Sequence, residues 1–167
     1  MHYNILNQYT KAMKNNFLLL LAIAISLLAC QPENRVYIEH QELSPDFEWL
    51  QKDKRSFKVP VKSGVDYNLS LSFRYTTGYQ YEVGRVKVTE TSPSGEIQVY
   101  EYDLKVREAN GDYIGDPGLD IWDSEHVVAA NKQYEETGIY SYSLEHNMPQ
   151  DPMSFVMEIG VILDIVK

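Results

Sequence analysis

The stretch from residue 65 to residue 75 alternates apolar and polar side chains without exception. Val, Tyr, Leu, Leu, Phe and Tyr occupy its odd-numbered positions, and Asp, Asn, Ser, Ser and Arg occupy the even-numbered ones. Successive side chains of a β-strand point to opposite faces of the sheet, so this pattern gives one apolar face and one polar face. We expect a strand with one face in the core and the other in water.

Runs of the same kind recur along the chain and indicate further strands. They cover residues 35–40, 56–61, 81–91, 97–106, 127–134, 138–144 and 155–166. Turn residues separate them, and Ser92-Pro93-Ser94-Gly95 predicts a hairpin. Residues 45–50 and 119–123 are each expected to form one helical turn. About eight short strands without a helical period between them predict an all-β fold, an antiparallel and jelly-roll-like β-sandwich.

The amino-terminal part has the layout of a secretory signal. Lys11 and Lys14 precede an uncharged, mainly apolar stretch at residues 17–28, and Ala29 offers a small residue at a cleavage point. Twelve helical residues reach only about 18 Å, short of the roughly 30 Å hydrocarbon core, so a permanent transmembrane helix is disfavoured. We expect residues 1–29 to be a signal peptide. Residues 13–17 would serve as an ordinary signal start, so Met13 is an alternative first residue.

Cys30 is the single cysteine of the chain, which excludes an internal disulfide and a thiolate metal cluster. Leu27-Leu28-Ala29-Cys30 resembles the lipobox of bacterial lipoproteins, in which the thiol is acylated and the chain is cut before it. The alternative is an ordinary secretory signal with an incidental cysteine. Two or three acyl chains such as palmitate would hold the protein stably at a membrane. We expect a tether at residues 30–35 and a single domain at residues 36–167.

The charge of the chain limits its partners. The formal net charge is −9, and Lys11 and Lys14 lie in the signal segment, so the remainder is more acidic still. Nucleic acid is therefore an unfavourable partner, and membrane association must come from a lipid anchor and not from a basic patch. The histidines have no metal-ligand spacing and no serine lies in a G-x-S-x-G motif, so we expect no catalytic residue and no cofactor.

Two weaker candidate sites remain. Asp112, Asp116, Asp120 and Asp123, together with Glu125, could supply oxygen ligands to Ca²⁺, although their spacing differs from the D-x-[DN]-x-[DN]-G calcium loop. The more common role for such aspartates is to begin turns and to cap a short helix. A calcium-dependent hydrolase built on this loop is the least favoured of three hypotheses for function; the other two are given below.

Aromatic residues form the other candidate site. Tyr79, Tyr81 and Trp122, with Tyr75 and Trp49, could present flat rings to a sugar, which makes a surface glycan-binding module the alternative function. Aromatic side chains in an all-β domain more often form core and cross-strand pairs.

The order of several short motifs resembles the gliding motility lipoprotein GldH family of Bacteroidetes, from about residue 36 to residue 165. They are Val36-Tyr37, Pro45, Trp49, Phe57, Tyr67-Asn68-Leu69, Phe73-Arg74, Tyr79-Gln80-Tyr81, Gly111-Asp112-Tyr113-Ile114-Gly115, Asp120-Ile121-Trp122-Asp123, Tyr134, Gly138-Ile139-Tyr140, Glu145-His146-Asn147-Met148 and Glu158-Ile159-Gly160. The resemblance implies a non-enzymatic lipoprotein of the cell envelope that is associated with gliding motility. Its expected partners are components of the gliding apparatus and the linked surface secretion machinery, and its expected location is the outer membrane.

Overall fold

The computed structural model describes residues 34–167, which form one compact unit, Asn34–Lys167. The predicted signal peptide, Cys30 and most of the predicted tether lie outside the described residues. Eight long strands and three two-residue strands make up the regular structure of the described part. They are β1 (Arg35–Glu42), β2 (Glu48–Trp49), β3 (Arg55–Val61), β4 (Tyr67–Thr76), β5 (Val83–Thr91), β6 (Ile97–Lys105), β7 (Asp116–Pro117), β8 (Ile121–Lys132), β9 (Gly138–His146), β10 (Met153–Ser154) and β11 (Val156–Ile165).

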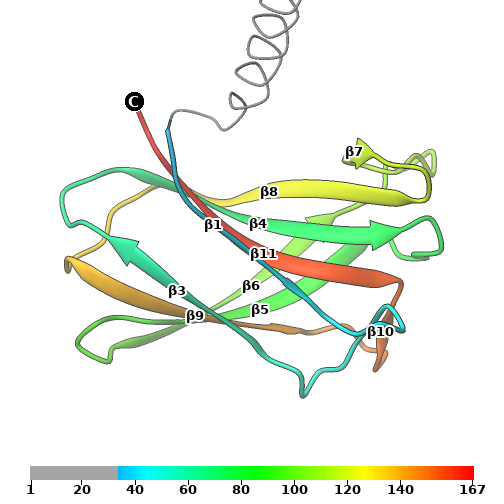
Figure 1. Cartoon of the computed structure of the whole chain (residues 1–167), viewed down its shortest axis with the longest axis horizontal. Helices are drawn as coiled ribbons and strands as arrows, with labels where there is room; N and C mark the ends of the chain where they lie inside the picture. The colour runs from blue at the N-terminus through cyan, green and yellow to red at the C-terminus, as the bar shows by residue number, and fades with distance from the viewer. Residues whose placement is uncertain (1–33) are drawn as a thin grey trace, which may run out of the picture. The chain divides into compact units, whose positions relative to one another are not determined.

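The long strands form two antiparallel sheets that face each other (Figure 1). The five-stranded sheet has the order β1-β11-β4-β8-β7, and the four-stranded sheet has the order β3-β9-β5-β6. Most successive long strands change sheet, and this is the connectivity of a jelly roll. The prediction of an all-β, antiparallel, jelly-roll-like sandwich is confirmed. Among residues 34–167 no helix is long and apolar enough to cross a membrane.

The alternating stretch at residues 65–75 forms β4, in the middle of the five-stranded sheet. Its odd-numbered side chains, from Tyr67 to Tyr75, are buried in the core between the sheets. Leu71 and Phe73 are completely buried there. Burying an apolar side chain of this size contributes about 1.5–3 kcal/mol relative to leaving it in water. The period-two pattern therefore fixes which face of β4 is inside.

Both predicted helical turns are wrong. Glu48–Trp49 is the short strand β2, which pairs with β10 (Met153–Ser154). Trp49 is fully buried, and its indole N–H donates to the Asp53 carbonyl at 2.7 Å, so core packing holds the chain extended there. Ile121–Asp123 begins β8, six residues before the predicted strand, because Trp122 continues the inward-facing row of that strand.

The hairpin predicted at residues 92–95 is confirmed. The Gly95 N–H donates to the Ser92 carbonyl at 3.0 Å, and Gly95 has a φ of 94°, a conformation that favours glycine. This turn joins β5 to β6 in regular antiparallel register. The two ends of the described unit also meet, since the Ile165 N–H donates to the Asn34 carbonyl at 2.8 Å.

Candidate functional site

A glutamate occupies a core-facing position near the end of β5. Val86, Val88 and Glu90 share one face of that strand, and all three are buried. Glu90 lies opposite Tyr142 of β9 in the same sheet. A carboxylate is costly to bury unless a cation or hydrogen-bond donors compensate its charge. The surroundings of Glu90 must therefore supply such groups.

Lys132, the last residue of β8 in the other sheet, supplies the compensating charge. Its Nζ lies 3.1 Å from Glu90 Oε2. The ammonium group also lies over the rings of Tyr100 and Tyr134, at 5.5 and 5.0 Å from their centroids. An aromatic face attracts a cation, so the two tyrosines favour this position of the ammonium group.

Next to this ion pair, two tyrosine hydroxyls are hydrogen-bonded to each other inside the core. Tyr134 Oη and Tyr142 Oη are 2.6 Å apart, and both side chains are buried. Burial raises the pKa of Tyr142, and the neighbouring Tyr134 and Glu90 raise it further. Burial likewise raises the pKa of Tyr134. Both phenols therefore stay protonated at neutral pH, and the Tyr142 hydroxyl can donate to the Glu90 carboxylate.

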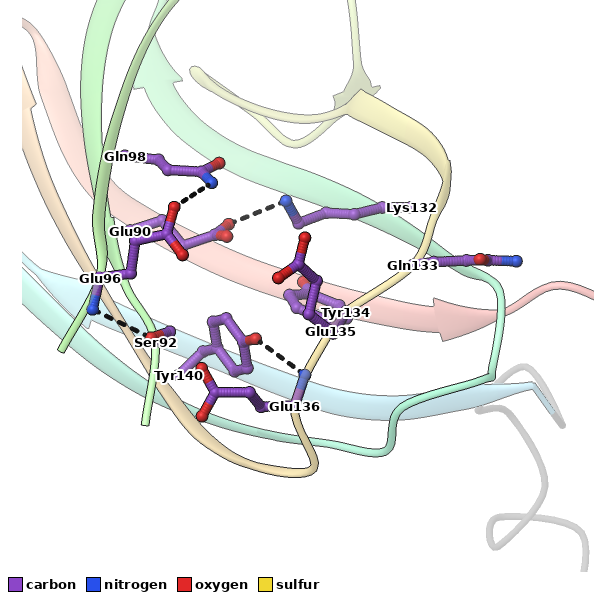
Figure 2. Close-up of a pocket in the computed structure, with 10 residues that line it drawn as sticks. All are labelled: Glu90, Ser92, Glu96, Gln98, Lys132, Gln133, Tyr134, Glu135, Glu136 and Tyr140. Carbon is purple, nitrogen blue, oxygen red and sulfur yellow. Dashed lines mark hydrogen bonds and ion pairs between the residues drawn. The ribbon is translucent and has the colours of Figure 1, made fainter. Parts of the chain in front are cut away.

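The ion pair lies in a pocket of about 210 Å³, which we call the Glu90 pocket (Figure 2). Its lining comes from β9, β5, the β5–β6 turn and β6 of the four-stranded sheet, and from the end of β8 and the loop that follows it. The lining residues are Glu90, Ser92, Glu96, Gln98, Lys132, Gln133, Tyr134, Glu135, Glu136 and Tyr140. Figure 2 shows the Glu135 side chain directed toward Glu90 and Lys132.

The Glu90 pocket is negatively charged overall, since its lining holds four glutamates against one lysine. Glu96 accepts a hydrogen bond from Gln98, and Glu136 accepts one from Ser94. Among residues 34–167 no group of three or more His, Cys, Asp or Glu side chains is arranged to hold a metal ion. Carboxylates beside tyrosine rings suit an organic cation, such as an ammonium or guanidinium group.

A second polar region covers the outer face of the five-stranded sheet. Arg74 on β4 donates to Asp123 on β8 and to Glu158 on β11, with N–O distances of 2.5 and 2.6 Å. Arg35 on β1 binds Asp164 and Glu125 at 3.0 and 2.8 Å. Arg35 and Arg74 both line a groove of about 240 Å³ on this face. Each arginine is neutralised by two carboxylates, so neither leaves an uncompensated positive charge for a ligand in the groove.

The structure separates the four aspartates of the calcium hypothesis. Asp112 is bonded within a turn to Asn110, whose amide donates to Asp112 Oδ2 at 2.7 Å. Asp116 and Asp123 are opposite each other in β7 and β8, but Asp123 is bound to Arg74. Asp120 precedes β8, and its carbonyl accepts from the Thr77 N–H. The four carboxylates do not converge on one point among the described residues.

The aromatic residues of the glycan hypothesis pack into or against the core. Tyr79 is fully buried, and its hydroxyl donates to the Val83 carbonyl at 2.9 Å. Tyr81 makes an edge contact with Tyr79, and Trp122 stacks on Tyr113 with ring centroids 5.1 Å apart. Tyr81 and Trp122 are half-buried. The three rings therefore do not form a flat exposed platform.

The Glu90 pocket was not predicted from the sequence, although a signal for it was present. Glu90 follows Val86 and Val88 at an inward position of an alternating run, where a charged residue is out of place. Lys132 similarly ends the inward row of β8. The pairing of the two residues depends on the packing of the two sheets, which spacing along the chain does not give.

Three solved structures have detectable but distant similarity to this chain. They are TmCBM61 in complex with β-1,4-galactotriose (15% identity, TM-score 0.32, 83% of this chain and 74% of that chain), the GH115 4-O-methyl-α-glucuronidase BtGH115A (14%, 0.36, 83% and 19%) and dimeric latent PorU from Porphyromonas gingivalis (12%, 0.31, 82% and 14%). At these identities and TM-scores, none of these likenesses bears on what the chain binds or does.

No curated protein matches the sequence. The family model for the GldH lipoprotein matches residues 35–163, from the first residue of β1 almost to the end of β11. The match thus covers nearly the whole sandwich, including both sides of the Glu90 pocket. This chain belongs to the GldH lipoprotein family.

Proposed function

We propose that the protein is a non-enzymatic binding subunit of the gliding apparatus and of the surface secretion machinery linked to it. Membership of a lipoprotein family associated with gliding motility makes it a membrane-anchored protein of the cell envelope. The family match over residues 35–163 is the observation that carries the proposal.

The proposed anchor is a lipid on Cys30, and the proposed location is the outer membrane. Cys30 is the single cysteine of the chain and follows the apolar segment directly. Diacylglyceryl transfer to its thiol, followed by cleavage before it, would leave a short polar segment between the lipid and β1. The acidic charge of the chain supports a lipid, because an acidic surface gains nothing from anionic headgroups.

The arrangement of the charged side chains supports a binding role. Arg35 and Arg74 are each held by two carboxylates, and Lys132 is held by Glu90. General acid–base or nucleophilic catalysis needs a reactive group beside a base that is free to take its proton. In these clusters the carboxylates are occupied by cations, which suits a rigid surface for recognition.

A deletion strain tests the proposal. Loss of the gene should abolish surface spreading and reduce secretion of surface proteins, and a wild-type copy should restore both. A Cys30→Ser copy should yield protein that no longer fractionates with membranes and should restore neither activity. Mass spectrometry of the native protein should find fatty acid on Cys30. Normal spreading and secretion in the deletion strain would contradict the proposed role, and a membrane-bound Cys30→Ser protein would contradict the anchor.

A further inference from the structure

The free edges of the two sheets are not alike. An open edge strand offers unpaired N–H and C=O groups to any other strand, and proteins usually protect such edges with prolines, bulges, charges or short strands. On one side of the sandwich, β1 has an irregular register between Arg35 and Tyr37, and β3 contains Pro60. The Gln41 side chain on β1 also donates to the Ser56 carbonyl on β3. This side is protected.

On the opposite side, the edge of the five-stranded sheet is protected as well. β7 has only two residues, one of which is Pro117. Beyond β7 the edge is formed by β8, whose register with β4 shifts twice between Tyr67 and Ser70, and Asn131 near its end has a φ of 51°. A second strand would not pair regularly along such an edge.

β6 has no proline, no bulge and no short length to protect it, and the charges in its middle, Glu101 and Asp103, are acidic. It pairs with β5 over nine residues without a register shift, and among the described strands it has no partner on its other edge. It contains no proline, and its single lysine, Lys105, stands at its end and is bound to Glu108. Two apolar side chains on its outer face are exposed, Ile97 by 64% and Val99 by 56%. An edge of this kind is a template for strand addition.

The Glu90 pocket lies directly beside this edge. Glu96 precedes β6, and Gln98 on β6 is part of the pocket lining. Tyr100, two residues further along the same face, lies beneath the Lys132 ammonium group. Side chains that are opposite each other on paired strands lie about 5 Å apart. A side chain of an added strand opposite Gln98 would therefore reach the glutamates of the pocket.

The charge of the pocket selects the occupant. Glu90 is more than nine-tenths buried, and its Oε2 accepts no hydrogen bond, although Lys132 balances its charge at 3.1 Å. Glu135 and Glu136 add negative charge to the lining of the pocket. A second copy pairing through β6 would bring two acidic strands and two acidic pockets together. Repulsion between these like charges disfavours such a dimer. The pocket instead complements an ammonium or guanidinium group.

We propose that a partner protein adds an extended segment to the free edge of β6 and places a lysine or arginine side chain of that segment in the Glu90 pocket. The backbone hydrogen bonds of the added strand supply affinity, and the pocket supplies the choice of sequence. The inference deepens the proposed binding role and rests on it, because it assigns the surface through which a component of the machinery is bound.

Peptide binding to the full mature protein tests this directly. The probe is a nine-residue peptide, blocked at both ends, in which threonine alternates with valine and one threonine is replaced by lysine. The matched probe has glutamate at that position. We expect the lysine peptide to bind at least tenfold more tightly at low salt, with NMR shifts confined to β6 and the Glu90 pocket. Equal binding of the two peptides, or shifts centred on another edge, would overturn the proposal.

Variants of the protein provide the matched controls. Val99→Lys places a positive charge on the edge and should weaken binding of the lysine peptide at least tenfold. Ile139→Lys makes the same kind of change at a side chain that is 59% exposed on β9, an internal strand of the same sheet, and should leave binding within twofold of wild type. Glu135→Gln should reduce the preference for lysine over glutamate, whereas Glu42→Gln on β1 should preserve it. Undiminished binding by Val99→Lys would refute the β6 edge.

Complementation separates this inference from the proposed function. In the deletion strain, Ile139→Lys should restore spreading and Val99→Lys should not, at equal protein level. Full restoration by Val99→Lys would overturn the β6 inference and leave the proposed function intact. A deletion strain without any defect would remove the proposed function, and the peptide measurements would then decide the β6 edge by themselves.

Discussion

Lys132 and Glu90 join the two sheets through an almost buried ion pair, with Nζ and Oε2 3.1 Å apart and side chains that are 16% and 7% exposed. One residue ends β8 and the other lies near the end of β5, so the contact closes the sandwich at this end. Removing water from two charges is costly, and their attraction repays the cost only while both are present. The pair therefore constrains substitution more strongly than it stabilises the fold.

Replacing only one member of the pair should destabilise the domain. Lys132→Met leaves the Glu90 carboxylate buried without its cation and should lower the free energy of unfolding by about 3 kcal/mol. The double variant Lys132→Met with Glu90→Leu should return to within about 1 kcal/mol of wild type, because no charge is then buried. Urea unfolding measures both values, and Lys58→Met on the surface of β3 is the control. A single variant as stable as wild type would contradict this account.

The buried His146 and the half-buried His126 should make stability dependent on pH. Burial lowers the pKa of His146, and the nearby Asp151 carboxylate, 3.5 Å from Nε2, opposes this only in part. Its Nδ1 accepts from the Met148 N–H at 3.3 Å, which fits the neutral ring. Burial also lowers the pKa of His126. The folded protein therefore takes up protons at a lower pH than the unfolded chain, for which the ordinary value is 6.5.

The sign of the effect follows from proton binding. Just below pH 6.5 the unfolded chain holds more protons than the folded one, so the free energy of unfolding should fall as the pH drops from about 7.5 to 5.5. His126→Gln and His146→Gln should each flatten this dependence, and the double variant should flatten it further. Urea midpoints at several pH values give the slope. An unchanged slope in the double variant would assign the dependence to other groups.

The sequence predicted the architecture well where local pattern decides structure. Period-two alternation identifies the buried face of β4, and the Ser92–Gly95 turn needs only local chemistry. The errors lie where distant contacts decide. Trp49 is held in β2 by pairing with Met153, which is far away in the sequence, and no local signal at residues 45–50 records that partner. The early start of β8 similarly depends on its pairing with Tyr75 and Thr76 of β4.

The candidate site could be predicted only in part. An inward glutamate at position 90 is visible in the sequence as a break in the apolar row of β5. Lys132 compensates the charge of Glu90 only because the two sheets pack face to face, and the spacing of the two residues along the chain does not reveal this contact. The aspartates of residues 112–123 were conspicuous in the sequence, yet the fold uses Asp112 in a turn and pairs Asp123 with Arg74. Density of acidic residues along a chain is therefore a poor guide to convergence in space.

A side chain at Gly160 should destabilise the domain. It lies on β11 between Ser72 and His40 of the neighbouring strands. A Cβ added there would meet the Ser72 Oγ and would lie 2.7 Å from the Glu39 carbonyl oxygen, which belongs to the backbone and cannot turn away. Gly160→Ala should therefore cost about 1–3 kcal/mol of unfolding free energy. Gly118→Ala, in a loop where the nearest atom would be 3.3 Å away, should cost clearly less in the same urea titration.

Arg35 should hold the first strand of the domain in place. Its guanidinium group binds Asp164 on the adjacent β11 and also reaches Glu125 on β8, on the far side of β4. β1 is an edge strand and follows the tether expected after Cys30, so it would bear any pull from a lipid anchor. Arg35→Ala removes both contacts and should lower the stability of β1 by about 1 kcal/mol. Amide hydrogen exchange should then be roughly fivefold faster in β1 while the centre of β4 is unchanged, since edge strands open locally.

Arg85→Ala, which removes an exposed ion pair with Asp103 between β5 and β6, is the matched control and should leave exchange in β1 as in wild type. Equal acceleration across all strands would show that Arg35 supports the whole sandwich and not its first strand.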